Sequence, residues 1–462
     1  MDHAAFTAEI RSIRLRRPIP FVCGAIFFTF MIGLYCAGEH VIYERIIRAW
    51  GVLPFTFPFV DTDTVLSAVR CMQRGVDVYA ANPCDVLRRV YDYSPLWLVL
   101  ARVPGAGTWL RPIGLSVDIA FLSSLLLLPV GRGWRDTMLI VLGAVSTAAV
   151  FAVERANNDL VIFVLVATAA TLIQRSAGWR LLGYTATLLA GLLKYYPMPL
   201  MIVATRERPG HFFTVAAGSL TIVGLFLVVD GHDLARALRL IPTGPYIDDM
   251  FGSIQLPGGL SDLFGWPAGV RTVLHLAMMA AAIGGGIIWG RSQLLREDIE
   301  RLSRQEQAFL LVGALLLPSL FFTAQNIGYR AIHLLLVLPP LLALRHAGHY
   351  RRAHSYTGGA ALALLWAEGW RHLIAVAATY VDTDLAAFLY AIAWLTRETM
   401  WWWTITALVA LATNMQLHSE MGRIGLSGLR QAISTRTAAR AVAQDDPASP
   451  YKINAVLRHF DQ

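Results

Sequence analysis

The sequence predicts an all-α polytopic membrane protein. Of its 462 residues, 56% are hydrophobic and only 15% are charged, whereas soluble chains carry roughly a quarter charged residues. The mean hydropathy is +0.53, and apolar runs approaching the roughly 20 residues that cross a bilayer recur along the chain. The net charge of +8 does not indicate nucleic acid as a partner, because membrane proteins gather arginines on cytoplasmic loops. No zinc-binding spacing, phosphate-binding glycine loop or nucleic-acid motif is present in the sequence.

The first apolar run, residues 18–37, is interpreted as a retained membrane span. It follows a cluster of arginines between residues 11 and 17, which resembles the start of a signal peptide. The run is long, lacks a clear cleavage site and precedes further spans, so we expect residues 1–17 to be a cytoplasmic N-terminus. Short basic segments such as "GRGWR" (131–135) then alternate with apolar runs, and the positive-inside rule places them on the cytoplasmic side.

Counting the apolar runs gives about 12 spans in a membrane domain over residues 18–415. The basic segment 416–462 is expected to be a cytoplasmic tail. Residues 384–415 form either one long span or two short ones, and the run 198–204 has only seven residues. Broken spans of this kind are tolerated where they line a cavity rather than face lipid. The exterior loops expected to be long are 38–110 and 230–268.

A short amphipathic helix is expected in the first exterior loop. Val65, Val69 and Met72 recur at intervals of four and three residues, which places them on one face of a helix. Such a helix lies on the membrane surface rather than crossing it. Asp61 and Asp63 stand at its start, where a carboxylate caps backbone N–H groups and favours the helix dipole. Either both are such structural acids, or one of them is a catalytic base.

Two other features of this loop lead to structural expectations. Cys71 and Cys84 share the loop, and an exterior location permits a disulfide, but we expect both thiols to be unpaired. Residues 95–103 are apolar yet too short to span a bilayer. We expect them to form a re-entrant segment.

A spaced set of residues in the same loop carries a family resemblance. The set is Asp61, Ala68, Gly75, Asp77, Tyr79 and the triplet Tyr93–Ser94–Pro95. With this spacing the loop resembles the signature of the family-87 glycosyltransferases, membrane enzymes of the GT-C superfamily. The departures are Val78, where proline is usual, and Val65, where tyrosine is common. The stretches 154–163, 191–200 and 329–340 are also similar, so the resemblance extends loosely over residues 20–345.

The resemblance implies a fold and a reaction. The fold is a GT-C-like bundle of about 12 transmembrane helices with short exterior juxtamembrane helices. The reaction moves a sugar from a polyprenyl-phosphate donor to a lipid or glycan acceptor, with inversion, on the exterior face of the cell (inner or plasma) membrane. The register selects Asp61 over Asp63 as the essential aspartate. No metal or cofactor is required by this scheme.

Polar residues at the predicted exterior ends of the spans are candidates for binding the donor phosphate and for contacting the substrate. The leaving polyprenyl phosphate gains negative charge, so cations aimed at it stabilise the transition state. The candidates for binding the donor phosphate are Arg155, Lys194, Arg330 and His333. The candidates for contacting substrate are Asp63, Tyr93, Asn157, Asn158, Asp159 and Tyr195.

Each candidate also has a structural alternative. Arg155 can pair with Glu154, and Lys194 and Arg330 can anchor span ends at the interface. His333 can pack as a satisfied histidine of the bundle. Residues 157–159 can form a turn that caps the next span. Outside this set, we expect Glu368 and Arg371 to pair with each other, and Asp248 and Asp249 to lie in a solvated loop rather than touch the acceptor.

Two other functions remain open from the sequence. The broken spans are compatible with a transporter or flippase of lipid-linked sugars, although the two halves of the chain show no repeat. A surface-polysaccharide polymerase or ligase would use cations of the second long loop, where Arg236 and Arg239 lie. Membrane lipids are expected partners under all three functions.

Overall fold

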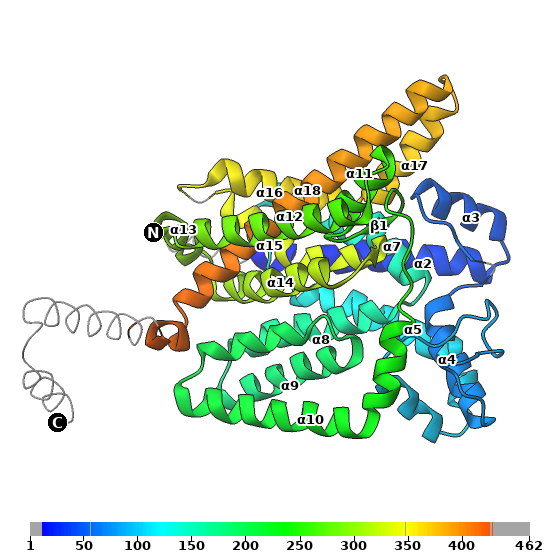
Figure 1. Cartoon of the computed structure of the whole chain (residues 1–462), viewed down its shortest axis with the longest axis horizontal. Coiled ribbons are helices and arrows are strands. Elements are labelled where there is room, and N and C mark those ends of the chain that lie inside the picture. Colours follow the sequence, from blue (N-terminus) through cyan, green and yellow to red (C-terminus); the bar gives the residue numbers. More distant parts are fainter. Residues whose placement is uncertain (1–11, 56, 347, 426, 428–462) are drawn as a thin grey trace, which may run out of the picture.

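Most long helices of the protein lie side by side with nearly parallel axes, whereas the longest, Thr383–Leu417, crosses them obliquely (Figure 1). The structure is a computed structural model, and it describes residues 12–55, 57–346, 348–425 and 427. Six helices in this part of the chain are long and apolar enough to cross a membrane. They are Ser12–Cys36, Leu110–Leu127, Trp134–Glu154, Pro209–Arg239, Ala268–Gly290 and Arg304–Thr323. The predicted all-α class with membrane-like helices is therefore confirmed.

Most elements follow one another along the chain with short connections, except for the segments 74–94 and 240–249. Those of the first half are α2 (Ile19–Cys36), α3 (His40–Ala49), α4 (Val60–Gln73), η1 (Pro95–Arg102), η2 (Ala106–Thr108), α5 (Leu110–Ser124), η3 (Leu125–Leu127), α6 (Trp134–Ala144), α7 (Thr147–Glu154), α8 (Asn158–Leu172), α9 (Ala177–Lys194), η4 (Met198–Arg206) and α10 (Pro209–Arg239). Those of the second half are β1 (Met250–Phe251), α11 (Gln255–Phe264), α12 (Ala268–Gly290), α13 (Gln293–Glu300), α14 (Arg304–Thr323), β2 (Asn326–Ile327), η5 (Gly328–His333), α15 (Leu334–Leu344), α16 (Arg351–Leu365), α17 (Ala367–Ala378) and α18 (Thr383–Leu417).

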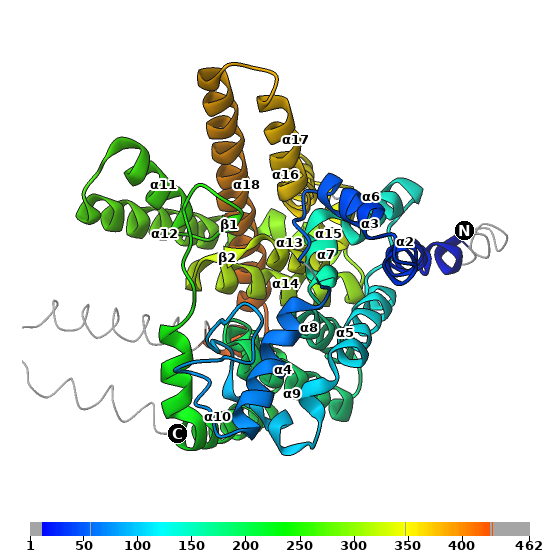
Figure 2. The same cartoon turned by 90° about the vertical axis from the view of Figure 1, so that its right-hand side faces the viewer.

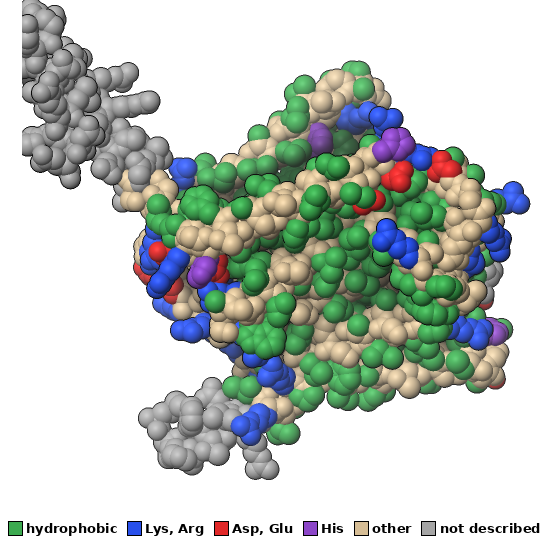
Figure 3. Space-filling view, turned by 90° about the horizontal axis from the view of Figure 1, so that it is seen from below, with side chains coloured by type: hydrophobic (Ala, Val, Ile, Leu, Met, Phe, Trp, Pro, Cys, Tyr) green, Lys and Arg blue, Asp and Glu red, His purple; other side chains and the backbone are tan. Residues whose placement is uncertain are grey.

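The core of the bundle is built around α14 and α15. Every residue of α15 is buried, and the helix packs against α14, α16 and α6. By contrast, α10 lies at the edge of the bundle (Figure 1), and its Val228 side chain is 84% exposed. Hydrophobic side chains cover the broad middle of the face in Figure 3, whereas lysines and arginines gather towards its two ends. This is the distribution expected of a helical bundle that sits in lipid.

Short elements gather at one end of the bundle. The helices α3 and α4 lie at the right-hand end in Figure 1, and Figure 2 looks onto that end. The expected short helix is α4, but it is buried within the protein on nearly all sides instead of lying on the surface, and Met72, expected on its apolar face, is exposed. The segment 95–103, expected to be re-entrant, contains the 3₁₀ helix η1 beside α4. The apolar run 198–204 falls within another 3₁₀ helix, η4. Residues 384–415 belong to one long helix, α18, which resolves the alternative left open above.

The second long loop is shorter than expected. Helix α10 continues to Arg239, so the predicted loop start at residue 230 is about three turns too early. The loop ends in β1, which pairs antiparallel with β2 through Met250–Ile327 and Phe251–Asn326. This pairing brings the loop against the chain that leads into η5. The predicted tail 416–462 lies largely outside the described residues.

Ion pairs tie this end of the bundle together. The predicted pair of Glu368 and Arg371 is confirmed, with 2.8 Å between Oε2 and Nε. Arg371 also pairs with Asp248, which therefore links the second loop to α17 instead of standing free in solvent.

Candidate active site

A cavity of about 510 Å³ opens at the end of the bundle where the short elements gather. Its walls come from α4, the segment 87–94, the turn after α7, the end of α9, the ends of α10 and α14, and η5. The charged residues that line it are Asp61, Arg89, Asp92, Arg155, Lys194 and Arg330. Four of these six were predicted to act together from the sequence, although they are spread over 270 positions.

The first turn of α4 is positioned by the turn that follows α7. Phe59 precedes α4 in a left-handed conformation, with φ of 69°, which reverses the chain into the helix. The Phe59 N–H donates to the Glu154 carbonyl at 2.9 Å, and the Asp61 N–H donates to the Arg155 carbonyl at 3.2 Å. Segments almost a hundred residues apart are thereby held in register.

The carboxylate of Asp61 is buried but reaches the cavity. It is 4% exposed and accepts a hydrogen bond from Asn157 Nδ2 at 2.6 Å. Arg89 Nη1 lies 3.3 Å from its Oδ1, and Arg155 Nη1 lies 3.9 Å from its Oδ2. Two guanidinium groups thus compensate the buried charge, and Asp61 is still one of the residues that line the cavity.

Neither aspartate of "VDTDTV" caps the helix. Both lie within the first turn, and no side chain makes a capping hydrogen bond at the start of α4, so the predicted capping role is wrong. Asp63 lies outside the cavity lining and pairs with Arg70 at 3.1 Å. Asp63 is therefore placed to support the cavity wall through Arg70 rather than to face the cavity.

Arg155 does not form the pair with Glu154 that its structural alternative predicts. Its ion pair is with Asp61, not with the neighbouring Glu154. The guanidinium stacks over the rings of Phe55 and Phe151, at 4.7 Å and 4.3 Å from their centroids. Such stacking holds the planar cation in place at the cavity wall.

Asp159 is the centre of a second buried cluster. Its Oδ2 accepts from Lys194 Nζ at 2.8 Å and from Arg330 Nε at 3.3 Å, and its Oδ1 accepts from the Tyr196 hydroxyl at 2.6 Å. Asp159 is fully buried and does not line the cavity, so its predicted contact with substrate is replaced by a role in holding the two cations. Lys194 is 8% exposed and pairs with Asp159, which contradicts the alternative that it anchors a span end at the interface.

Three other predicted residues are also removed from the cavity lining. His333 is fully buried, and its Nε2 lies 2.7 Å from the Tyr196 hydroxyl, so the alternative of a packed bundle histidine holds and its predicted contact with phosphate does not. The Asn157 side chain caps α8 by accepting from the Asp159 N–H at 2.8 Å, as the capping alternative predicts. Asn158 is buried beside it. Asn157 still contributes to the site through Asp61.

The predicted tyrosines lie where expected. Tyr93 and Tyr195 both line the cavity, and Lys194 Nζ lies 5.1 Å from the centroid of the Tyr93 ring. Tyr195 adopts a left-handed conformation, with φ of 58°, at the end of α9. This strained residue directs the chain away from α9 just after Lys194.

Two charged residues of the cavity were missed from the sequence. Arg89 bridges Asp61 and Asp85, and its Nη2 lies 3.0 Å from Asp85 Oδ2. Burial alone would lower its pKa, but the hydrogen bond and charge of Asp85 raise the pKa of Arg89 overall. Asp92 has a raised pKa because it is buried, although Lys194 opposes this effect. Asp92 directly precedes the triplet Tyr93–Ser94–Pro95, but the triplet itself assigns no role to it.

A disulfide between Cys71 and Cys84 fastens the segment that carries Arg89. The prediction of two unpaired thiols is therefore wrong, and the described thiols that remain free are Cys23 and Cys36. The bond joins the last turn of α4 to the segment 84–94. Arg70 donates to the Cys84 carbonyl at 3.2 Å as well as to Asp63, so covalent and polar links act together.

Removing this disulfide is expected to destabilise this end of the bundle. A bond that closes a loop of 13 residues contributes about 3 kcal/mol by restricting the unfolded chain. We expect Cys71→Ser/Cys84→Ser to lower the unfolding midpoint in detergent and to make the segment 84–94 more sensitive to protease. Cys23→Ser, which removes a free thiol, is the matched control. Equal stability of the two variants would contradict the prediction.

Asp77 is kept away from the two aspartates of α4. Its Oδ2 lies 2.5 Å from Arg236 Nη2, and this hydrogen bond lowers the pKa of Asp77. Within the described residues, no group of three or more His, Cys, Asp and Glu side chains is arranged to hold a metal ion.

Comparisons of the chain with protein-family models, with curated proteins and with solved structures give no match. The site must therefore be interpreted from its own chemistry. Four cations and two carboxylates face one cavity in the described part of the chain. Such a lining favours an anionic ligand, with a carboxylate held close enough to act on it.

Proposed function

We propose that the protein is a polyprenyl-phosphate-sugar-dependent glycosyltransferase in which Asp61 is the general base. The observation that carries the proposal is the convergence of Asp61, Arg155, Lys194 and Arg330 on one cavity. A base and a set of cations are the two components that an inverting displacement from a lipid phosphate requires.

The proposed reaction proceeds in one displacement. The acceptor hydroxyl passes its proton to Asp61 while its oxygen forms a bond to the anomeric carbon of the donor sugar. The bond between that carbon and the phosphate oxygen breaks, and its electron pair remains on the departing polyprenyl phosphate. Lys194 and Arg330 stabilise this developing charge. Asn157 and Arg89 hold the Asp61 carboxylate in orientation.

The apolar wall of the cavity suits the lipid part of the donor. Leu238, Ile241 and Leu320 line it at the ends of α10 and α14, and α10 exposes its apolar face along its length. A prenyl chain attached to a phosphate near Lys194 can leave the cavity along these residues into the bilayer. This direction supports a lipid-linked donor over a soluble sugar nucleotide.

The proposal also specifies the number of membrane spans and the side of the membrane that the cavity faces. The six long helices, together with shorter apolar helices such as Asn158–Leu172 and Gly328–Leu344, would form a GT-C-like bundle of about 12 spans. The cavity would then face the exterior side of the plasma membrane. The acceptor would be a lipid or glycan hydroxyl.

The decisive experiment is transfer by the purified protein. The full chain in detergent is incubated with a radiolabelled polyprenyl-phosphate sugar and a membrane lipid extract as acceptor. We expect labelled product from the wild type and about 10²- to 10³-fold slower transfer from Lys194→Gln, because one charge-stabilising donor is lost. Arg48→Gln, which changes an exposed residue of α3, is the control.

The outcome also separates the alternative functions. Uptake of the intact donor into proteoliposomes, with no cleavage of the sugar–phosphate bond, would replace the enzyme with a flippase. Transfer only from a diphosphate-linked glycan would replace it with a polymerase or ligase. Equal transfer by the wild type and Lys194→Gln would remove the proposed phosphate site.

A further inference from the structure

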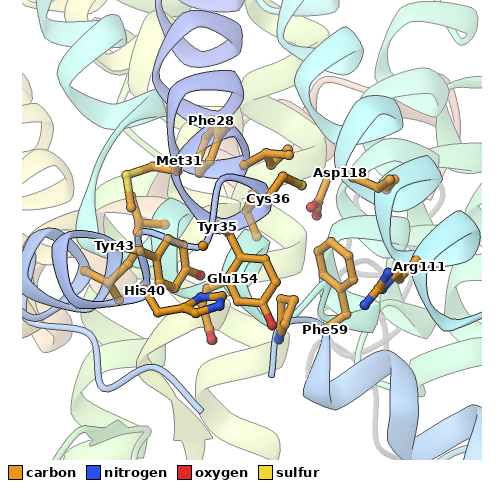
Figure 4. A pocket seen from close by; sticks show the side chains of 17 residues that line it. Phe28, Met31, Tyr35, Cys36, His40, Tyr43, Phe59, Arg111, Asp118 and Glu154 are labelled. Carbon is orange, nitrogen blue, oxygen red and sulfur yellow. The ribbon is translucent and has the colours of Figure 1, made fainter. Parts of the chain in front are cut away.

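A second cavity of about 450 Å³ lies between α2, α3, α5 and α7 (Figure 4). It shares no lining residue with the first cavity. The first turn of α4 and the end of α7 form the wall between them: Phe59 and Glu154 line the second cavity, whereas Asp61 and Arg155 line the first. The roles proposed above leave the second cavity unexplained.

The lining of this cavity is mainly apolar and aromatic. Phe28, Tyr35, Tyr43 and Phe59 contribute rings, and aliphatic side chains of α2, α3 and α7 cover the rest. Figure 4 shows several of these rings around the open space. The faces of such rings attract cations, and clusters of them bind ammonium groups.

Asp118 points into the cavity without a partner. Its carboxyl is directed towards the space between Cys36 and Phe59 in Figure 4. The residue is 3% exposed, and its Oδ1 is buried with no hydrogen bond. Within the described residues it takes part in no ion pair. A buried carboxylate in an apolar setting is unfavourable unless a cation or donor accompanies it.

Glu154 provides a second unsatisfied oxygen on the same lining. Its Oε1 accepts from the Phe55 N–H at 3.3 Å, but its Oε2 is buried with no partner. Glu154 is 6% exposed. Two carboxyl groups therefore face one apolar cavity, and the basic side chains that line it, Arg111 and His40, are both exposed.

We propose that this cavity binds an ammonium group carried on an apolar body. The ammonium N–H groups satisfy Asp118 and Glu154, and the aromatic rings enclose the charge and the adjoining carbon chain. An anionic ligand is disfavoured by the carboxyl groups, and a purely apolar ligand leaves their oxygens unpaired. This chemistry occurs both in free amphipathic amines and in the headgroup of an aminolipid, whose phosphate Arg111 would contact at the exposed edge.

The test compares two probes of the same shape. Binding of 4-phenylbutylammonium and of neutral 4-phenylbutanol to the full chain in dodecyl maltoside is measured by titration calorimetry, with empty micelles as the blank. We expect the amine to bind at least tenfold more tightly than the alcohol. Asp118→Asn and Glu154→Gln should each remove at least this tenfold preference, whereas Asp262→Asn, which changes an exposed acid of α11, should keep it.

Folding of the variants is checked separately. Asp118→Asn keeps the size of the side chain and removes a buried group with no partner, so its unfolding midpoint without ligand should equal or exceed that of the wild type. Equal binding of amine and alcohol by the wild type would overturn the proposal. So would an unchanged preference in both Asp118→Asn and Glu154→Gln.

Two additional measurements distinguish an aminolipid from a free amine as the ligand, and test whether the second cavity binds independently of the first. Phosphatidylethanolamine that displaces the amine, under conditions where phosphatidylglycerol does not, assigns the site to an aminolipid, whereas no displacement by either lipid assigns it to a free amine. Asp61→Asn should leave amine binding unchanged, because Asp61 lies on the other side of the wall. The proposed ammonium site can therefore be tested independently of the proposed sugar transfer.

Discussion

Asp61→Asn is expected to lower sugar transfer by about 10²- to 10⁴-fold, the range over which a positioned general base contributes. Asparagine has the size of aspartate and can still accept the hydrogen bond from Asn157, so the first turn of α4 should keep its place. It cannot take the proton of the acceptor hydroxyl. Initial rates with a labelled polyprenyl-phosphate sugar, at saturating donor, measure the effect.

Two other carboxylates provide matched controls. Asp63→Asn changes a group outside the cavity that pairs with Arg70, and we expect less than a tenfold loss. Asp92→Asn changes the other carboxylate of the cavity. If Asp92→Asn abolishes transfer while Asp61→Asn keeps most of it, the base has been assigned to the wrong carboxylate. Circular dichroism and the unfolding midpoint show whether each variant is folded.

Four of the six charged residues that line the cavity could be predicted from the sequence. Asp61, Arg155, Lys194 and Arg330 each follow or end an apolar run, and the alternation of basic and apolar segments assigns these ends to one side of the bundle. Charges at the ends of apolar runs that face the same side are expected to converge. In the structure, these four residues all line the same cavity.

The partners of those residues could not be predicted in the same way. Arg89 is one of several arginines in the first long loop, and nothing in its spacing indicates contact with a residue 28 positions earlier. The disulfide that holds its segment depends on the distance between two cysteines in three dimensions. Helix periodicity carries no information about either contact.

The sequence also could not predict which members of the charged cluster face the cavity and which are buried behind it. His333 and Arg330 are three residues apart on η5, and both were expected to face a phosphate. Arg330 lines the cavity, whereas His333 is buried against Tyr196. Which of two neighbouring side chains faces a cavity depends on how η5 packs against α7 and α16, and this packing is a long-range property.

Asp159→Asn should be among the most destabilising single substitutions in the protein, with an expected loss of about 3–5 kcal/mol in the free energy of unfolding. The Asp159 carboxylate is fully buried and accepts from Lys194 and Arg330 at 2.8 Å and 3.3 Å. Without its charge, two cations remain close together with no other ion-pair partner among the described residues. Chemical unfolding in detergent, followed by tryptophan fluorescence, measures the loss.

The structure offers a control of the same chemistry for this prediction. Asp118→Asn also neutralises a buried aspartate, but one with no ion pair among the described residues, so it should not destabilise the protein. The double variant Asp159→Asn/Lys194→Met should recover part of the stability lost in Asp159→Asn, because one of the unpaired cations is gone. A polyprenyl phosphate should stabilise Asp159→Asn more than it stabilises the wild type, since its phosphate replaces the missing charge at Lys194 and Arg330. If Asp159→Asn proves as stable as Asp118→Asn, the cluster is not held by Asp159, and the two cations must be positioned by the packing of α9 and η5 alone.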